Sequence, residues 1–566
     1  MKMNLKSILR IGCAAVAWLT VASGALGATY HVDCGAVGEN SAQGTGTELN
    51  PIRTLEQLNQ VQLAPGARVL FKRGSVCYGT FRPAAGSSGA PGAPIVVDAY
   101  GPEALPRPVI AAGCRKSRSD PAQASTESAK TAGGISPYHS LCTYDNGPAV
   151  RAAIHLFNVQ QWEINSLELS NDGLSDGPRV GLLVQLENFG TGSHYRINNL
   201  YVHHVRGFSN DTKGPVMFKE TGGILFNITR GTDRSAVPVK TRFDDVLIEN
   251  SEIYHVDAIG ISNRSSWMCR TNGAPCADYL LPGETPAMLA DPAVRAGIAY
   301  YASTRFVIRN NKIHDIGGDG IIVRTASAPR VESNLIYEGW MRVAGDSAGA
   351  WAINTDDALF QYNEVHGMRK RDKMGDGMAF DADLGTWNTV VRDNYSHDNE
   401  GGLMLFCGCG SDSMGNQGKA IGALVENNLS LNDGSRIITI NGAEQGVVRG
   451  NLVVTNKPGL DVALIESNRY PGKNEVAFEG NQLIDAAGTG RLARLSHRPG
   501  SLADVRLSGN TMAGYSPEME FAGEKLVQGP QSNTFNAAGP QDIERAVARW
   551  FAGSAFSKNR YRSGSR

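Results

Sequence analysis

One short phrase recurs along most of this chain: two or three apolar residues, an asparagine two or three positions later, and another apolar pair. Clear copies surround Asn250, Asn311, Asn334, Asn363, Asn394, Asn428 and Asn451, and weaker copies surround Asn165, Asn199, Asn481 and Asn510. From Asn311 onward the copies are roughly 23 to 34 residues apart, a spacing typical of solenoids. A unit of this size cannot bury its apolar face alone, so each coil must stack on the next. The chain is therefore expected to form one elongated body with a regular outer surface.

The composition fits a stack of short strands. The chain has 566 residues, of which 66 are glycine, and aromatic residues make up 7%. This balance is typical of many strands separated by tight turns. Length alone would suggest about three or four domains, but a solenoid can remain a single unit as it grows. The repeat asparagines are expected at coil corners, where they tolerate left-handed φ and can form a ladder of stacked amides.

The first 27 residues are typical of a secretory signal. Lys2, Lys6 and Arg10 form a basic start, residues 11–21 are apolar but too few to span a bilayer, and a cleavage site precedes Ala28. We expect a secreted or periplasmic chain with no membrane anchor. Loss of three cations and no acid takes the formal net charge from −1 to about −4, which gives no general attraction to nucleic acid. The expected partner is a polysaccharide or oligosaccharide, and the chain is expected to be a monomer.

Eight cysteines remain once the signal is removed, and an even number in an exported chain favours disulfides. Proximity suggests the pairs Cys34–Cys77, Cys114–Cys142 and Cys269–Cys276, although spacing alone does not fix the connectivity. The sequence Cys407-Gly408-Cys409 lacks further metal ligands at a familiar spacing. It favours a local bridge or a link to another part of the chain.

The start of the mature chain carries a resemblance to a known fold. Residues 55–58 suggest a short helix, and residues 63–74 suggest a turn followed by an alternating strand. This stretch resembles the N-terminal cap and first coil of right-handed parallel β-helix proteins of the pectate-lyase-like superfamily. The resemblance implies an all-β, right-handed parallel β-helix solenoid with an N-terminal helical cap. A short C-terminal helix is also predicted, because Ile543, Val547 and Phe551 share one helical face.

The expected layout has five parts. They are a signal peptide (1–27), an N-terminal cap with the first coils (28–115), a surface excursion rich in Ser, Ala and Gly (116–150), the parallel β-helix (151–515) and a C-terminal cap with a basic tail (516–566). Two insertions interrupt the β-helix near 208–240 and 263–300. Long insertions on a solenoid usually leave from one set of turns and often wall a groove.

The stretch Met378-Ala379-Phe380-Asp381-Ala382-Asp383 holds the main chemical signal. Side chains alternate between the two faces of a strand, so Met378, Phe380 and Ala382 would point inward. Asp381 and Asp383 would point outward together, with their Cα atoms roughly 6.5–7 Å apart. Paired carboxylates serve glycosidic bond cleavage or calcium binding, although a lone pair of this kind is usually only solvated.

The preceding coils would place further polar groups beside Asp381 and Asp383 if the strands stack in an assumed register. With Ile353 stacked on Phe380, Asn354 would lie beside Asp381 and Asp356 beside Asp383, with Arg324 in the same column one coil earlier. Parallel strands lie about 4.8 Å apart, so these side chains would form one outer patch. An error of one residue in the register would turn every side chain to the other face.

The surrounding segments offer further candidates. His397, on the next coil, is a possible proton shuttle or only a loop residue, with Glu400 near it as an added carboxylate. Arg371 and Lys373 belong to a basic loop that could hold a uronate carboxylate. Trp387 could stack on a sugar ring, whereas Trp351 is expected inside the coil. The aspartates of two Gly-Asp-Gly segments, Asp319 and Asp376, are interpreted mainly as turn residues.

The order of these motifs resembles that of polygalacturonases within the β-helix group. Asn354-Thr355-Asp356, Asp381-Ala382-Asp383, His397 and Arg436-Ile437-Ile438 follow one another as that family's motifs do. The aspartate pair is spaced, His397 lacks flanking glycines and the final lysine is absent. By this resemblance Asp356, Asp381 and Asp383 would be the acid and base carboxylates.

Three functions are therefore compared. The leading hypothesis is a secreted glycoside hydrolase without a cofactor, in which Asp381, Asp383, Asp356 and His397 are catalytic and Arg324, Asn354, Lys373, Arg371, Trp387 and Glu400 bind substrate. The first alternative is a polysaccharide lyase or C5-epimerase, in which His397, Arg324 and Lys373 act on a uronate and the aspartates Asp381 and Asp383 hold calcium. The second alternative is a carbohydrate-binding or adhesin solenoid without catalysis.

Overall fold

The structure is a computed structural model. It describes residues 27–35, 44–117, 142–144, 151–173, 177–207, 218–230, 238–270, 299–343, 345–370, 376–408, 420–434, 436–459, 461–465, 475–495, 505–515, 518–521, 524–527 and 533–562. Residues 1–26 of the expected signal and nearly all of the expected excursion at 116–150 lie outside these ranges.

Three long sheets run along the molecule. The first sheet contains β1 (Thr29–Val32), β2 (Arg68–Lys72), β4 (Ile95–Tyr100), β9 (Trp162–Asn165), β12 (Thr191–Asn198), β15 (Arg242–Glu249), β18 (Ser303–Arg309), β21 (Ala326–Ser327), β22 (Arg330–Glu332), β25 (Leu359–Gln361), β29 (Val390–Arg392), β33 (Leu424–Glu426), β37 (Gly446–Arg449), β40 (Val476–Glu479) and β43 (Val505–Ser508). The second contains β3 (Val76–Tyr78), β5 (Val109–Ala112), β10 (Glu168–Asn171), β13 (Tyr201–Val205), β16 (Glu252–Val256), β19 (Lys312–Ile316), β23 (Leu335–Tyr337), β26 (Glu364–His366), β30 (Tyr395–His397), β34 (Leu429–Leu431), β38 (Leu452–Thr455), β41 (Gln482–Asp485), β44 (Thr511–Ala513) and β47 (Thr534–Asn536). The third contains β8 (Ala152–Phe157), β11 (Val180–Glu187), β14 (Gly222–Thr229), β17 (Ile259–Ser265), β20 (Ile321–Arg324), β24 (Ala350–Ile353), β27 (Met378–Ala382), β31 (Gly402–Cys407), β35 (Arg436–Asn441), β39 (Asp461–Ile465), β42 (Arg491–Leu495), β45 (Glu518–Phe521) and β46 (Glu524–Val527).

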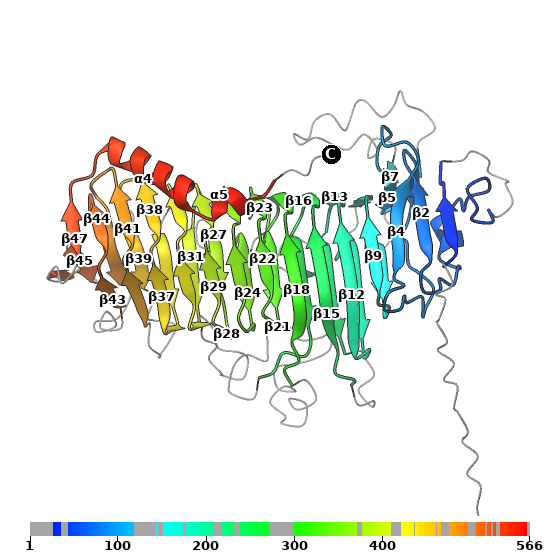
Figure 1. The fold of residues 1–566 in the computed structure, drawn as a ribbon, viewed down its shortest axis with the longest axis horizontal. Helices are drawn as coiled ribbons and strands as arrows, with labels where there is room; N and C mark the ends of the chain where they lie inside the picture. Colours follow the sequence, from blue (N-terminus) through cyan, green and yellow to red (C-terminus); the bar gives the residue numbers. More distant parts are fainter. Residues whose placement is uncertain are drawn as a thin grey trace, which may run out of the picture.

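The order of strands within the sheets defines a solenoid. Each sheet takes one strand from every successive coil, so neighbours in a sheet are far apart in the sequence. Pairing within the three sheets is parallel, except for the terminal β45–β46 pair. Figure 1 shows the coils stacked along one axis from the N-terminal to the C-terminal end. The predicted parallel β-helix is therefore confirmed. Short β28 (Thr386–Trp387), β32 (Ala420–Ile421) and β36 (Ala443–Glu444) form a small side sheet, and β6 (Cys114–Ser117) pairs with β7 (Cys142–Tyr144).

A ladder of buried asparagines fixes the register of successive coils. After the first member, Asn311, each side-chain oxygen accepts from the backbone N–H and the Nδ2 of the asparagine one coil earlier, and the Nδ2 distances are 2.9 to 3.1 Å. Each Nδ2 also donates to a backbone carbonyl of the previous coil. The members are Asn311, Asn334, Asn363, Asn394, Asn428, Asn451, Asn481, Asn510 and Asn533. The predicted structural role of the repeat asparagines is confirmed for these positions.

Two details of the ladder differ from expectation. Asn250 lies outside it and is exposed, because the neighbouring Ser251 donates its backbone N–H to the oxygen of Asn311. The left-handed corner conformation belongs to the residue before each ladder asparagine from Asn311 to Asn510, as in Ser333 (φ 58°) and Asp393 (φ 52°). The ladder residue itself is thereby turned inward, where its amide can reach the next coil.

The third sheet approaches the second closely through a column of glycines. Gly181, Gly223, Gly260, Gly320 and Gly349 occupy equivalent positions on successive coils. A Cβ atom at any of them would lie 2.4 to 2.6 Å from a side-chain carbon of the second sheet, too close for any real contact. The column therefore sets the thickness of the coil beneath the region where the acidic residues lie.

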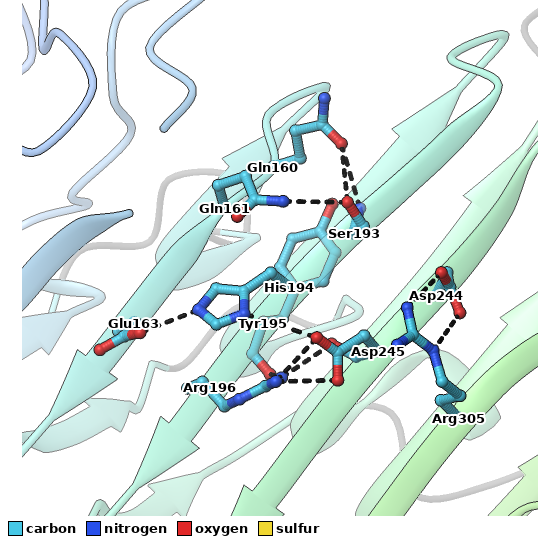
Figure 2. Close-up of polar contacts among 10 residues, drawn as sticks. All are labelled: Gln160, Gln161, Glu163, Ser193, His194, Tyr195, Arg196, Asp244, Asp245 and Arg305. Carbon is cyan, nitrogen blue, oxygen red and sulfur yellow. Dashed lines mark hydrogen bonds and ion pairs between the residues drawn. The ribbon is translucent and has the colours of Figure 1, made fainter. Parts of the chain in front are cut away.

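The outer face of the first sheet carries polar contacts from coil to coil, as Figure 2 shows. His194 lies between Glu163 (2.8 Å) and Asp245 (3.5 Å), and Arg196 binds both carboxylate oxygens of Asp245. Arg305 makes the same two-pronged contact with Asp244. Each of these charged side chains thus has a partner of opposite charge on a neighbouring coil, as is common on a solvent-facing sheet surface.

Few helices accompany the sheets. Helix α1 (Leu55–Leu58) buries both of its leucines in the main core and is the short N-terminal helix that the sequence predicts. Helices α4 (Pro540–Gly553) and α5 (Phe556–Asn559) lie along one side of the stack (Figure 1), and a 3₁₀ turn, η3, covers Phe218–Glu220. Ile543, Val547 and Phe551 pack with Leu429, Leu452, Val454 and Ile484 of the second sheet.

Disulfides occur at the N-terminal end and near the insertions. Cys34 and Cys77 are bonded, as their proximity predicts. Cys269 and Cys407 are also disulfide-bonded. Cys276, the expected partner of Cys269, and Cys409, which lies two residues after Cys407, are outside the described residues. Within the described ranges, every helix is too short or too polar to cross a membrane.

Replacement of Asn394 by alanine tests the ladder. The variant leaves the N–H and Nδ2 of Asn363 without their acceptor in a dry interior, and each buried group left unpaired costs about 1–3 kcal/mol. Urea unfolding should show that loss of stability. The matched control is Asn250→Ala, which removes amide bonds to Asn198 and Asn310 at an exposed site and should change stability little. Equal effects in the two variants would contradict the structural role of burial.

Candidate active site on the third sheet

The acidic strand β27 lies in the middle of the third sheet, and its pairing fixes what surrounds it. Ala350, Trp351 and Ala352 of β24 pair with Phe380, Asp381 and Ala382. Phe380 and Ala382 belong to the main core, so Asp381 faces the other way, beside Trp351. Asp383 continues the register, since its N–H donates to Ala352 O at 2.9 Å. Asp381 and Asp383 therefore share the outer face, as the alternation of side chains predicts.

The guessed register between the coils is wrong by three residues. Phe380 pairs with Ala350 and not with Ile353, so Asn354 does not lie beside Asp381, nor Asp356 beside Asp383. Arg324 pairs with Ile353 and therefore stands in the column of Asp383. Met378 does not join the main core and packs with Leu405 and Cys407 instead.

The connections between the second and third sheets are longer in the two coils that hold the acidic strand and its neighbour. Ile321 follows Asn311 by ten positions, whereas Ala350 follows Asn334 by sixteen and Phe380 follows Asn363 by seventeen. The longer connections contain Asp346 and Asp376, and the carboxylate of Asp376 lies near those of Asp346 and Asp383. Added residues that leave the ladder intact thus contribute two carboxylates to the candidate site.

Five aspartates, Asp319, Asp346, Asp376, Asp381 and Asp383, form what we call the aspartate cluster. Asp381 is 5% exposed, and its Oδ1 is buried and accepts no hydrogen bond within the described part of the chain. Burial, then the nearby carboxylates of Asp383 and Asp376, raise the pKa of Asp381 well above its usual range. An aspartate in this setting favours its protonated form, which is the form that a general acid requires.

Asp376 has the same electrostatic character but is more accessible. Burial, then the carboxylates of Asp346 and Asp383, raise its pKa well above the usual range, and the cations Lys219 and Arg436 act in the opposite direction. Asp376 and Asp383 are both half-buried, whereas Asp381 lies beneath the surface. The two aspartates that a substrate could touch therefore flank one that it could hardly reach.

Trp351 forms the floor of the candidate site. Its Nε1 donates to Asp319 at 2.8 Å, and Asp319 also accepts from the N–H of Ala348 at 3.0 Å. Lys219 lies 4.4 Å above the indole ring, and the guanidinium carbon of Arg324 lies 5.3 Å from its centroid. Burial raises the pKa of Asp319. The cations compensate part of the charge that the aspartate cluster concentrates on this face.

Several predicted residues have structural partners elsewhere. Arg270 donates its Nε to Asn354 at 2.7 Å and pairs with Asp356 at 2.9 Å, and the hydroxyl of Tyr300 also reaches Asp356. Asn354 and Asp356 thus hold both ends of the insertion near 263–300. Trp387 forms a β-bridge with Asp356 and belongs to the small side sheet, not to the third sheet.

The histidine and the basic loop also lie apart from the acidic strand. His397 belongs to β30 of the second sheet, where it contacts Asp398 and Glu364. Glu400 accepts from Arg369 at 2.9 Å and from the N–H of Lys370 at 2.7 Å. Arg371 and Lys373 lie outside the described residues. Of the predicted site residues, the structure brings together Asp381, Asp383 and Arg324.

Sequence reasoning missed four members of this site. Asp319 and Asp376 were interpreted as turn residues, and Asp346 and Lys219 lay in segments without a motif. Trp351 was expected inside the coil, and it is buried and packs with the main core. The usable signal was the Gly-Asp-Gly segment directly before a strand in both cases, because such an aspartate leads onto the outer face. Arg436, which the polygalacturonase resemblance singled out, is buried near Asp376 and donates to Thr439 at 2.7 Å.

A second buried aspartate shows what a structural carboxylate looks like in this fold. Asp433 accepts from the hydroxyls of Ser396 (2.6 Å) and Ser430 (2.7 Å), and from the N–H (3.0 Å) and Nδ2 (2.9 Å) of Asn399. Both of its oxygens are satisfied. Asp381 and Asp433 are equally enclosed, but only Asp433 has a hydrogen-bonding reason to be there.

Comparisons with known proteins agree with this architecture. A family model described as a right handed beta helix region matches residues 290–511. A lacto-N-biosidase from Bifidobacterium longum subsp. longum is 26% identical over 522 residues, which cover 82% of this chain and 29% of that protein. The chain thus spans less than a third of the length of this relative.

Solved structures give the same fold. The native GH136 lacto-N-biosidase from Eubacterium ramulus is 24% identical, with a TM-score of 0.56 over 80% of this chain and 67% of that one. Its selenomethionine derivative is 22% identical, with a TM-score of 0.56 over 81% of this chain and 67% of that one. These likenesses show a right-handed parallel β-helix.

Burial raises the pKa of both Asp381 and Asp433, but only Asp433 accepts a full set of hydrogen bonds, so amidation of the two should have opposite effects. The pKa of Asp381 is higher in the folded than in the unfolded chain, so its ionisation destabilises the fold as pH rises above about 4 and through the raised pKa. Asp381→Asn should therefore be more stable than the parent chain, and the gain should grow with pH in thermal melts. Asp433→Asn should lose stability, because an NH₂ group cannot accept from Ser396 and Ser430. A pH-independent gain at Asp381 would contradict the electrostatic cause.

Proposed function

We propose that this chain is a glycoside hydrolase that cleaves an oligosaccharide or polysaccharide by carboxylate acid/base catalysis. The observation that carries the proposal is the aspartate cluster, in which Asp376 and Asp381 have raised pKa values on the outer face of one sheet. Glycosidases use two carboxyl groups, one protonated and one ionised, on either side of the scissile bond. The distant likeness to lacto-N-biosidases supports the same chemistry.

We assign the two reacting carboxyls to the accessible members of the cluster. Asp376, with its raised pKa, would protonate the leaving oxygen, and Asp383 would act on the anomeric carbon directly or through water. Asp381 is buried, and its carboxyl feels the charges of both Asp376 and Asp383. It would be a positioning residue that keeps a proton within the cluster. Trp351 and Arg324 support the floor beneath the sugar, with Lys219 at its rim. Asp383 stays in the role that the sequence predicts, and Asp376 replaces Asp356.

The names of the relatives suggest a class of substrate to test. The disulfide-bonded cysteines suggest the cellular compartment of the protein. Lacto-N-biose-containing oligosaccharides are the first substrates to test, since both relatives are named for that activity. The disulfides at Cys34, Cys269 and Cys407 fit an exported chain, because such bonds persist in oxidising compartments. We keep the secreted or periplasmic location, and cleavage near Ala28, as part of this proposal.

Single substitutions test the assignment against the sequence-based one. Asp376→Asn and Asp383→Asn should each lower kcat about 10²–10⁴-fold on the substrate found in a glycan panel, because each removes an acid or base. Asp356→Asn is the matched control, since that carboxylate holds Arg270 and Tyr300, and its kcat should change only a few-fold. Full activity in the first two variants, with the fold intact by circular dichroism, would end the assignment.

The same panel separates hydrolysis from elimination. A lyase leaves an unsaturated sugar that absorbs in the ultraviolet, and the alternative with calcium on Asp381 and Asp383 would lose activity in a chelator. The hydrolase proposal expects saturated products and no effect of the chelator. A chain that binds glycans without turnover would instead identify the non-catalytic alternative.

The pH profile gives an independent test through Asp346. This exposed carboxylate is, after burial, the largest cause of the raised pKa of Asp376. Asp346→Asn removes a negative neighbour and lowers that pKa, so Asp376 would lose its proton at a lower pH. The alkaline limb of the kcat/KM profile should therefore move to lower pH, while the variant remains active at its optimum. An unmoved limb would show that Asp376 is not the acid.

A further inference from the structure

A row of stacked rings runs along the outer face of the second sheet, and we call it the ring ladder. It contains one residue from each of six successive coils, with centroids 4.4 to 5.3 Å apart and ring planes within 28° of parallel. The members, in paired register, are His203, Tyr254, His314, Tyr337, His366 and His397. The ladder is separate from the third sheet, on which the aspartate cluster lies.

The C-terminal end of the ring ladder differs from the rest, because two imidazoles stack directly on each other. His366 and His397 have centroids 4.4 Å apart, and Glu364 projects from the same face of β26 two residues before His366. One ligand atom each from Glu364, His366 and His397 lies within 4.8 Å of the others. The Glu364 Oε1 to His397 Nε2 distance is 3.5 Å.

The ring of His397 is oriented by a carboxylate on its second nitrogen, Nδ1, as is usual for histidines that bind metals. Its Nδ1 lies 2.8 Å from Asp398 Oδ2, a contact that orients the ring and leaves Nε2 directed toward Glu364. This Nε2 is buried and makes no hydrogen bond within the described residues. A carboxylate behind a histidine fixes its tautomer and raises its basicity as a ligand.

The ligand types of the group also suit a cation. Glu364 contributes an oxygen ligand with negative charge. Two imidazoles and one carboxylate are a common ligand set for zinc, which takes four ligands and can complete its shell with water.

We propose that Glu364, His366 and His397 bind one divalent transition-metal ion of the zinc type, with Asp398 as the orienting carboxylate. Donor atoms around tetrahedral zinc are about 3.4 Å apart for bonds of about 2.1 Å. Atoms up to 4.8 Å apart must close by about 1.4 Å at most, so binding requires the His366 ring to turn out of its stack on His397. The three ligands are half-buried, so an ion can enter from solvent.

The site would join two coils to the C-terminal helices. Glu364 and His366 come from β26 and His397 from β30, so one ion would tie these neighbouring coils on their outer face. The ring of Tyr395 lies 4.3 Å from His397 and packs edge-on against Phe551 and Phe556 of the two C-terminal helices. The role of the ion is therefore structural, and it does not depend on the proposed hydrolase activity.

Zinc binding by the untagged full chain tests the proposal. Titration calorimetry with zinc chloride, and elemental analysis after dialysis, should find one zinc per chain. His366→Phe keeps a ring in the ladder but removes the ligand, and it should weaken zinc binding at least about 100-fold, while Asp398→Asn should weaken it about 10–100-fold. His314→Phe is the matched control, since His314 occupies the same ladder between Tyr254 and Tyr337 but bonds to Glu252, and it should bind zinc like the parent chain.

A second substitution protects the test from loss of folding. Glu364→Gln retains the shape of the side chain and should also weaken binding, with the circular dichroism spectrum and melting temperature of the zinc-free chain unchanged. The absence of stoichiometric zinc in the parent chain would overturn the proposal. So would equal zinc affinity in the parent chain, His366→Phe and Glu364→Gln.

Discussion

The asparagine ladder is the constraint on which the rest of this structure depends. Each buried amide finds its acceptor only if the next coil presents an asparagine at the same height, so the coils cannot slip relative to one another. A buried amide left without a partner costs more free energy of folding than one hydrogen bond contributes in net terms. A slip in register would leave such amides unpaired, so only one register is stable here. From Asn311 onward, the acidic and aromatic columns on the outer faces take their alignment from this inner ladder.

The ladder also explains how the candidate site could form without damage to the core. The coils that carry Asn334 and Asn363 have longer loops between the second and third sheets, but their ladder bonds are as short as those of the other coils. Extra residues are therefore absorbed outside the coil, where they bring Asp346 and Asp376 to the acidic strand. The aspartate cluster concentrates negative charge that the fold does not need, which is the usual mark of a functional site.

The sequence allows the positions of some residues in the fold to be predicted, but not those of others. The recurrence of an asparagine every few dozen residues predicts the stack, the ladder and the outward pair Asp381 and Asp383, because these follow from local periodicity. The register between β24 and β27 was matched on the resemblance of two short motifs, whereas the distance of each strand from its ladder asparagine places Ala350 within one position of Phe380. His397 was misplaced for a related reason, because it follows Asn394 by only three positions and the chain is still in the second sheet there.

The two clusters of ionisable side chains in this fold are organised by different physical rules. On the second sheet, Glu364 and Asp398 each lie 2.8 to 3.5 Å from a nitrogen of His397, so each carboxylate has a base beside it. On the third sheet, Asp376, Asp381 and Asp383 are like charges, and the nearby cations do not cancel the effect of burial on their pKa values. A group of paired acids and bases can be retained for stability or for an ion, whereas a group of like charges is maintained against stability. For that reason we place the chemistry on the third sheet and the structural ion on the second.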